Sequence, residues 1–480
     1  MKRPESDVAG GASRAARLFQ QVDATPLVLF RIGFGAIAVW EVYRYFSKGW
    51  IQAYYVKPKF HFTYYGFEWV RPWPGRGMEL HFALLGVCAA LMTLGLWYRL
   101  ASILFAFGFT YVFLLEETRY LNHFYLLSVL SFLMAVVPAN RTLALDARLR
   151  PSMASGTVPA WALVLLTAQV SIAYFFGGVA KINGDWLRGE PMRKWVAREE
   201  DFPIIGRWMG EEWMTWIFVY GGLLFDLLVA PCLLWRRSLP FALPAVFSFH
   251  LLNDRLFRIG IFPWFMMAAT VLYLPPSWLR LGGRFGQAIP AGAPPTTLTP
   301  AQRTIAGLVG VHLALQCLVP LRHHLYPGNV SWTEEGHRFS WHMKLRTKRG
   351  SATFHVTDPA SGRSWTIEPK RFLTRRQVGK MAVHPDMILQ FAHYLAREFR
   401  DAGYPNVEVR ATVMASLNGR PDRPLIDPDV DLAKEPRSLR LNSWIVPLDE
   451  PLPSRKDPRA ARKVRAAVEN AETAVEGSLL

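Results

Sequence analysis

The sequence contains few cysteines. Cys88, Cys232 and Cys317 are the three, each lies in or beside an apolar run, and no CxxC pair occurs. A disulfide framework or a zinc site needs several cysteines at regular spacing. The sequence therefore predicts neither, and we expect no metal site. The thiols are expected to be small packing residues.

Charged residues are also scarce. They make up 19% of the 480 residues, whereas apolar residues make up 51%. Soluble domains carry roughly 25% charged residues. The apolar residues gather before about Pro320, in runs that approach the thickness of a hydrocarbon core. These features predict an integral membrane protein rather than a soluble one.

The sequence lacks any nucleic-acid-binding motif, although its net charge is +18. The lysines and arginines are scattered among the predicted loops instead of forming one patch. Anionic lipid headgroups account for part of this charge. We therefore expect membrane lipid, and no nucleic acid, as a partner.

Nine apolar segments are candidates for membrane spans. They are residues 27–43, 80–97, 101–115, 124–137, 161–180, 213–235, 243–252, 259–274 and 305–319. Several are shorter than the about 18 residues that a perpendicular span needs, so they must tilt or lie among neighbours. We predict about nine transmembrane helices within residues 25–320. A polar segment, residues 1–24, precedes them and shows no cleavable signal peptide.

The pattern changes after Val319. Strand-like stretches, one amphipathic stretch and an Asn-Gly turn follow one another at residues 351–356, 364–368, 384–399, 407–415 and 418–419. We predict an α+β domain outside the bilayer over residues 321–450. Residues 451–480 are expected to form an exposed basic tail. The fold class is thus a multispan α-helical membrane protein with an extramembrane α+β domain.

An odd number of spans places the N-terminus and the C-terminal domain on opposite sides of the membrane. The lysine and arginine counts on the two sides are about equal, but arginine-rich short turns favour a cytoplasmic N-terminus. We therefore predict that the C-terminal domain is extracytoplasmic.

Polar residues at the ends of the predicted spans are candidates for function. They are Asn122, His123, Lys181, His250 and Asn253. The predicted topology puts all of them on one membrane face, together with Trp341 of the C-terminal domain. Convergence of separate segments is typical of an active site. Each residue also has a structural interpretation, since lysines snorkel to headgroups and buried histidines pack through hydrogen bonds. From the residues alone the function stays open.

Six blocks of unusual composition occur along the chain. They are LLEETRYLNHFYL (114–126), GGVAKINGDW continuing to Met192 (177–192), FSFHLLN continuing to Phe262 (247–262), FSWHM (339–343), LNGR continuing to Leu432 (417–432) and NSWIVPL (442–448). In this order they resemble segments of the vitamin K-dependent γ-glutamyl carboxylase family, in the form of its bacterial members with an HTTM domain. The likeness extends from about Thr25 to Leu448.

The resemblance implies a reaction. Members of the family oxygenate a quinol, here reduced vitamin K or menaquinol, with O₂ to its epoxide, and they add CO₂ to a protein glutamate. A glutamate γ-proton is too weakly acidic for an ordinary side-chain base, and the oxygenated quinol supplies the stronger base. The resemblance also implies a bacterial inner or plasma membrane and a glutamate-containing protein or peptide as the partner.

The resemblance assigns roles to residues. Lys181 is implied as the base that starts the reaction, which requires a neutral amine and therefore burial. Asn122 and His123 would donate hydrogen bonds to the developing quinone oxyanion, and His250, Asn253 and Trp341 would shape the quinol cavity. The residues implied for glutamate binding are Asn418, Arg420 and Arg423.

The chain departs from the family at two positions. Ala180 stands where members often have a second lysine, and His342 stands where animal members carry an acidic residue. Two alternatives therefore stay open beside the carboxylase. One is a quinol epoxidase that does not carboxylate, and the other is a non-enzymatic multispan protein such as a transporter. Charges at span ends, rather than at mid-membrane, argue against transport.

Overall fold

The computed structural model of the protein describes residues 13–280 and 287–452. The described chain divides into two compact units. We call them the helical unit (Met1–Lys57, Phe67–Val179 and Leu224–Leu321) and the mixed unit (Pro58–Gly66, Ala180–Leu223 and Arg322–Leu480). Nearly all of the predicted basic tail, and half of the predicted N-terminal segment, lie outside the described residues.

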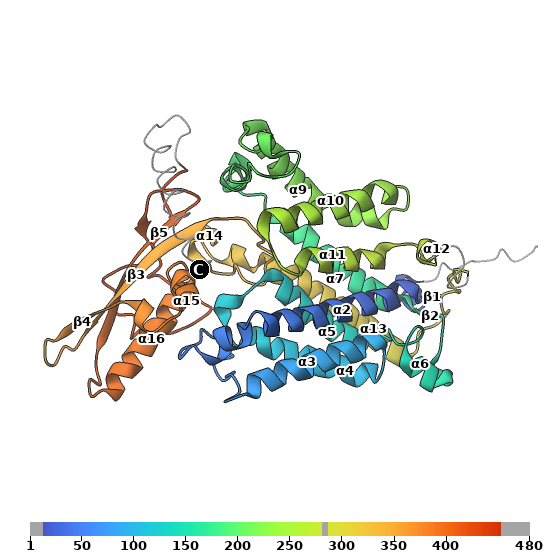
Figure 1. The fold of residues 1–480 in the computed structure, drawn as a ribbon, viewed down its shortest axis with the longest axis horizontal. Coiled ribbons are helices and arrows are strands. Elements are labelled where there is room, and N and C mark those ends of the chain that lie inside the picture. The colour runs from blue at the N-terminus through green and yellow to red at the C-terminus, as the bar shows by residue number, and fades with distance from the viewer. Residues whose placement is uncertain (1–12, 281–286, 453–480) are drawn as a thin grey trace, which may run out of the picture. The chain divides into compact units, whose positions relative to one another are not determined.

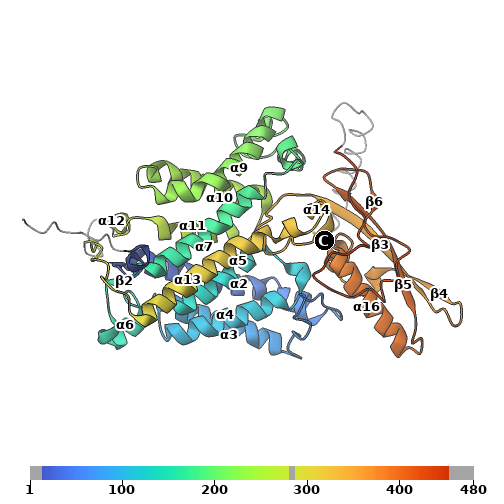
Figure 2. The same ribbon diagram turned by 180° about the vertical axis from the view of Figure 1, so that it is seen from behind.

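The helical unit is an assembly of apolar helices. Its elements are α1 (Arg14–Arg17), β1 (Gln21–Asp23), α2 (Thr25–Ser47), α3 (Gly77–Leu94), α4 (Tyr98–Leu114), α5 (Asn122–Val136), α6 (Leu145–Leu149), β2 (Thr157–Pro159), α7 (Ala160–Val179), α10 (Leu239–Phe257), α11 (Phe262–Ala269), α12 (Pro276–Leu279) and α13 (Pro300–Leu318). The long helix α9 (Glu212–Leu234) belongs to both units. Figures 1 and 2 show α2, α3, α4 and α5 running side by side.

Within the part of the chain that the structure describes, five helices are long and apolar enough to cross a membrane. They are Thr25–Ser47, Gly77–Leu94, Ala160–Val179, Glu212–Leu234 and Pro300–Leu325. Three shorter apolar helices, Tyr98–Leu114, Asn122–Val136 and Phe262–Tyr273, fall on other predicted segments. The remaining predicted segment, residues 243–252, lies on α10, whose last turns carry His250, Asn253 and Asp254. The predicted segments are helical, but their number as membrane spans, nine, is not confirmed.

The first long helix, α2, starts at Thr25, next to two residues that favour a helix start. The Asp23 carboxylate accepts hydrogen bonds from the Thr25 backbone N–H (2.9 Å) and hydroxyl (2.7 Å), and Pro26 occupies the first turn. Further along α2, Phe34 packs edge-to-face against Phe105 of α4 and Phe265 of α11. These rings form part of the core of the helical unit.

The mixed unit contains a four-stranded antiparallel sheet in the order β4-β3-β5-β6. Its elements are α8 (Met192–Val196), α14 (Val330–Thr333), β3 (Lys348–Thr357), β4 (Ser364–Ile367), α15 (Arg375–Met381), α16 (Pro385–Asp401), β5 (Glu408–Leu417) and β6 (Arg423–Pro424). Helices α15 and α16 lie against β3 and β5 (Figure 1). The strands and the amphipathic helix predicted after Val319 are therefore confirmed.

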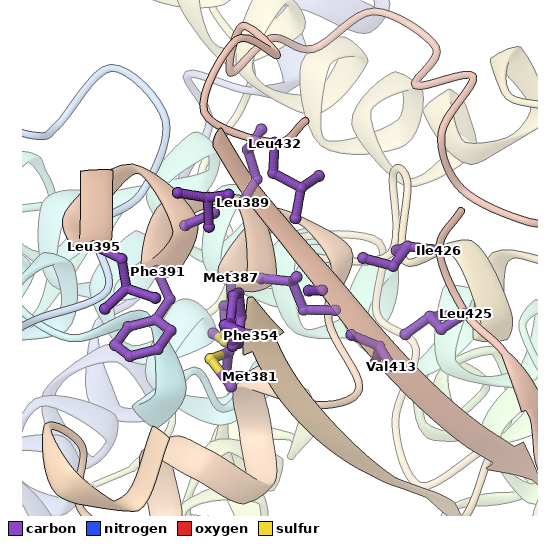
Figure 3. Close-up of a cluster of buried hydrophobic side chains, with 14 of the residues drawn as sticks. Phe354, Met381, Met387, Leu389, Phe391, Leu395, Val413, Leu425, Ile426 and Leu432 are labelled. Atoms are coloured by element: carbon purple, nitrogen blue, oxygen red, sulfur yellow. The ribbon is translucent and has the colours of Figure 1, made fainter. Parts of the chain in front are cut away.

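A core of buried side chains joins sheet and helices. Phe354 of β3 and Phe391 of α16 are fully buried, and their rings meet edge-to-face with centroids 5.0 Å apart. Figure 3 shows Phe354 beside Met381 and Phe391 beside Leu395, with Val413 elsewhere in the same cluster. Strand alternation and helix periodicity aim these residues at one interior.

A short segment from early in the chain, residues 58–66, completes this unit. The Gln390 side chain accepts a hydrogen bond from Thr63 N (2.9 Å) and donates one to Thr63 O (3.1 Å). Phe62 is fully buried in the core, and Phe60 packs against it. The unit therefore includes more than the predicted domain 321–450, because residues 58–66 and 180–223 belong to it as well.

We expect Phe62→Ala to destabilise the protein by about 3–5 kcal/mol, because it removes a fully buried ring and leaves a cavity. Thermal unfolding of the detergent-solubilised protein would show a lower Tm. Phe67→Ala is the matched control, since Phe67 is 39% exposed. Equal Tm values for the two variants would contradict a core role for this segment.

Candidate functional site

Two predicted histidines of the helical unit share an aromatic neighbour. His250 of α10 is buried, and its ring centroid lies 5.9 Å from that of Phe262. The His123 ring, in the first turn of α5, lies 5.6 Å from the same phenylalanine. The structure thus gathers two sequence-distant histidines of the family-like blocks around one ring.

The sequence analysis missed a residue of this group. The Tyr174 hydroxyl of α7 lies 2.7 Å from His250 Nε2. Tyr174 stands in the middle of an apolar run, so neither hydropathy nor charge set it apart. A buried phenol beside an imidazole can exchange a hydrogen bond with it in either direction.

The two predicted asparagines make local contacts. Asn122 Oδ1 accepts a hydrogen bond from the Tyr120 hydroxyl (2.9 Å). Asn253 Nδ2 donates to the carbonyl of Phe249 one turn earlier (2.9 Å). Asn122 therefore has a side-chain partner at the start of α5, whereas the Asn253 amide is bonded to a backbone carbonyl of its own helix.

A small cavity lies among α2, α3, α4 and α5. Most of its lining is aliphatic or aromatic, and Phe124, which follows His123, is part of it. Glu41 and Arg119 are the charged residues of the lining. The Glu41 carboxylate pairs with Arg44 Nη1 at 2.6 Å. The cavity therefore has mostly aromatic and aliphatic walls and few charged groups.

Lys181 belongs to the mixed unit and is buried, with 6% of its surface exposed. It lies in a turn after α7 in which Asn183 Nδ2 donates to Ala180 O (2.9 Å) and Asn183 Oδ1 accepts from Trp186 N (3.0 Å). The Lys181 Nζ lies 5.5 Å from the centroid of the Trp186 ring. The turn therefore buries this amine close to an aromatic face.

The Trp186 ring is itself held in place by α9. Its indole N–H donates to the Val219 carbonyl of α9 (3.1 Å), and the side chain is 1% exposed. A Cβ on Gly222 would lie 4.0 Å from Lys181 Cε. This is an ordinary van der Waals distance, so Gly222 lies close to the lysine stem without crowding it.

The residues predicted to bind a glutamate carboxylate contact one of the chain's own carboxylates. Arg420 Nη1 and Nη2 donate to Asp185 Oδ2 (2.7 Å) and Oδ1 (2.8 Å). Asn418 Nδ2 donates to Asp185 Oδ2 (2.8 Å). Arg423 differs, because it is exposed and pairs with Glu450 (2.6 Å). The donors that sequence reasoning assigned to a substrate therefore hold Asp185.

Trp341, the predicted cavity residue of the FSWHM block, is buried with 1% exposure. Its φ is +57°, and the neighbouring Phe339 and Lys344 also have positive φ, at +60° and +49°. Non-glycine residues avoid this region unless the surroundings impose it. The block therefore has an unusual backbone path that ordinary strand or helix patterns do not predict.

A charged cluster next to this block was also missed. Glu334 accepts ion pairs from Arg346 Nη2 (2.6 Å) and Lys348 Nζ (3.3 Å). His384 Nε2 lies 3.8 Å from the same carboxylate. These residues come from separate elements, so no spacing in the sequence indicates the cluster.

Burial shifts the ionisation of this cluster. Desolvation lowers the pKa of Lys348 to about 8, although Glu334 opposes the shift. Burial, followed by nearby His323 and Arg346, lowers the pKa of His342 to about 3. A neutral histidine beside a shared ion pair avoids placing another buried positive charge there.

Among residues 13–280 and 287–452, no three His, Cys, Asp or Glu side chains lie close enough to hold a metal ion.

The cluster predicts a loss of stability in acid. The unfolded chain binds a proton at His342 near pH 6.5, whereas the folded chain binds it only near pH 3. Between these values the unfolded state holds more protons, so stability falls as the pH falls. We expect the Tm to drop from pH 7 to pH 5, and to drop less in His342→Gln.

His355→Gln is the control for this measurement, because His355 is a half-buried histidine on strand β3. It should retain the wild-type difference in Tm between the two pH values. An unchanged pH dependence in His342→Gln would contradict the assignment.

Two known protein-family models match the chain, one over its apolar helices and one over its C-terminal part. The model described as the HTTM domain matches residues 19–278. The model described as the lumenal domain of vitamin K-dependent gamma-carboxylase matches residues 301–451. No solved structure matches the chain.

The first match covers the apolar helices before α13, including those that carry His123 and His250, and it spans more than half of the chain. The second covers the sheet, its helices and the FSWHM block. Both occur in the order that the six sequence blocks predict. The chain is therefore an integral membrane protein that belongs to the vitamin K-dependent gamma-carboxylase family.

Proposed function

We propose that the protein is a quinol-dependent γ-glutamyl carboxylase. It would couple oxygenation of reduced vitamin K or menaquinol to carboxylation of a protein glutamate. The substrates are quinol, O₂, CO₂ and glutamate, and the products are quinone epoxide, water and γ-carboxyglutamate. The observation that carries the proposal is the buried Lys181 in the block that the family match includes.

Lys181 is proposed as the initiating base. Its amine would take the proton of a quinol hydroxyl, and the oxygenated quinol then supplies the stronger base for the γ-proton. Burial against Trp186 keeps water away from the amine. Asn122 and His123 are proposed to donate hydrogen bonds to the quinone oxyanion, because both stand at the start of α5.

The quinol cavity is proposed to involve His250, Asn253 and Trp341. The contact between the Tyr174 hydroxyl and His250 Nε2 supports this assignment for His250. Arg423 is exposed and pairs with Glu450 at 2.6 Å, and it is proposed to exchange this partner for the substrate carboxylate.

A specific observation favours a second candidate. Arg420 and Asn418 already bind Asp185, so two of the predicted glutamate ligands are engaged. A quinol epoxidase that does not carboxylate would need no glutamate site. Incubating the protein with reduced vitamin K, a glutamate peptide and labelled CO₂ separates the candidates, because only the carboxylase fixes label.

We expect Lys181→Ala to reduce epoxide formation and CO₂ fixation together by about 10²- to 10⁴-fold, the usual contribution of a positioned base. Both products would be measured in one reaction. Lys370→Ala is the control, because this lysine of the mixed unit is 75% exposed. Undiminished epoxide formation in Lys181→Ala would remove the residue from this role.

The proposed topology has nine spans, a cytoplasmic N-terminus and an extracytoplasmic C-terminal domain. An alkaline phosphatase fused after Leu480 should be active in bacterial cells, because this enzyme folds only outside the cytoplasm. A fusion that ends in the loop before α7, at Gly156, should be inactive. The reverse pattern of activity would show that the orientation is wrong.

A further inference from the structure

We propose that the turn between β5 and β6 is a clamp that positions the Lys181 turn through Asp185. Arg420 is then a positioning residue for the base and not a ligand of the substrate. This inference rests on the role of Lys181 in the proposed function. We define the clamp as Asn418 and Arg420, and the Lys181 turn as residues 180–190.

The contact between the two parts is a bidentate ion pair with a third donor. Both outer nitrogens of Arg420 bind the two oxygens of Asp185, at 2.7 and 2.8 Å, and Asn418 adds a bond of 2.8 Å. Arg420 and Asn418 are 7% and 3% exposed. A charge-assisted pair with this fork geometry fixes orientation as well as distance. Asp185 therefore has a defined place relative to the sheet.

The position of Asp185 determines that of the residues around Lys181. The Asp185 carbonyl accepts from Glu190 N (2.9 Å), which closes the turn. Asp185 is followed directly by Trp186, whose ring faces the Lys181 amine. Asn183 links Ala180 to Trp186, so the turn is bonded internally. A shift of Asp185 would therefore move the Trp186 ring that lies beside the Lys181 amine.

The clamp itself is held by the sheet. Asn418 has a φ of +53°, its backbone N–H donates to Thr347 O (2.8 Å), and its Oδ1 accepts from Thr347 N (2.8 Å). Arg420 Nε donates to Glu450 O (2.8 Å), and Ser416 Oγ donates to Arg420 O (2.6 Å). The donors therefore have little freedom to swing toward another carboxylate.

A second contact, between α8 and the β5–β6 turn, joins the same two segments. Lys194 of α8 donates its ammonium to the Asn418 carbonyl (3.2 Å). Gly419, at φ +84°, allows this approach, because a Cβ there would lie 2.1 Å from Lys194 Nζ. The β5–β6 turn thus contacts the chain beyond Lys181 at two places, at Asp185 and at Lys194.

The alternative roles of Arg420 differ in what its loss would do. A glutamate ligand would raise the KM for the glutamate peptide and leave the quinol reaction unchanged. A clamp would lower the kcat of epoxidation and leave both KM values nearly constant, because substrates still bind while the base is misplaced. A pair that merely stabilises the fold would loosen the whole mixed unit.

The experiment uses Asp185→Asn, Arg420→Gln and the double variant in the full-length protein. We expect each single variant to lower the kcat of epoxidation by about 10- to 100-fold, since misplacement by about 1 Å has effects of this order. Both KM values should change by less than about twofold. The double variant should be no worse than either single variant, because the two residues act as one unit.

Backbone hydrogen exchange gives a readout that does not need activity. Peptides from 180–190 should exchange faster in the variants, while peptides from β3 and β5 should not change. Arg410→Gln is the matched control, because Arg410 lies on β5, pairs with Glu408 and is 43% exposed. It should alter neither the kcat nor the exchange of the Lys181 turn.

The outcomes separate the two proposals. An increase in the KM for glutamate at constant kcat would make Arg420 a substrate ligand and overturn the clamp. Faster exchange throughout β3 and β5 would make the pair a general stabiliser and also overturn it. An inactive wild-type protein would overturn the carboxylase, and the exchange of residues 180–190 would then decide on the clamp.

Discussion

The cost of removing charge from water is the constraint on which the described parts of this protein depend. An unpaired buried charge is strongly destabilising, so buried ions need partners with good geometry. Arg31 of α2 is fully buried and donates to the carbonyls of Ala139 (3.2 Å) and Leu143 (2.5 Å). In the mixed unit the buried partner is a charge, because Asp185 forms an ion pair with Arg420. These pairs tie together segments that are far apart in the sequence.

Much of the fold follows from periodicity. The apolar runs predict helices because a long hydrophobic stretch has few other stable arrangements, and alternation predicts β3 and β5. Periodicity does not reveal residues 58–66 as part of the mixed unit. Gln390 lies 327 residues from its partner Thr63, and the contact joins a side-chain amide to the backbone of that one residue. Such a contact leaves no repeat in the sequence.

The candidate site shows the same division. Resemblance to a family pointed to Lys181, and the structure finds this residue buried beside an aromatic ring. The family resemblance could not assign the partner of Arg420, because a substrate glutamate and the chain's own Asp185 both offer a carboxylate. Residue type indicates the chemistry of a site, but only the fold decides which of two chemically equal groups occupies it. Tyr174 was missed for a related reason, since a lone tyrosine in an apolar helix is more often a packing residue.

The Glu334 cluster connects this constraint with the departures of the chain from animal members of its family. Glu334 shares its carboxylate between Arg346 and Lys348, so a further cation beside them would lack a counter-charge. Burial and these neighbours keep the pKa values of His337, His342 and His384 below the ordinary range, so the histidines stay neutral at pH 7. A histidine at position 342 therefore fits a basic interior in its neutral form, where lysine or arginine would not. The departure at His342 is thus compatible with the fold of the FSWHM block, although it removes a negative charge that animal members have there.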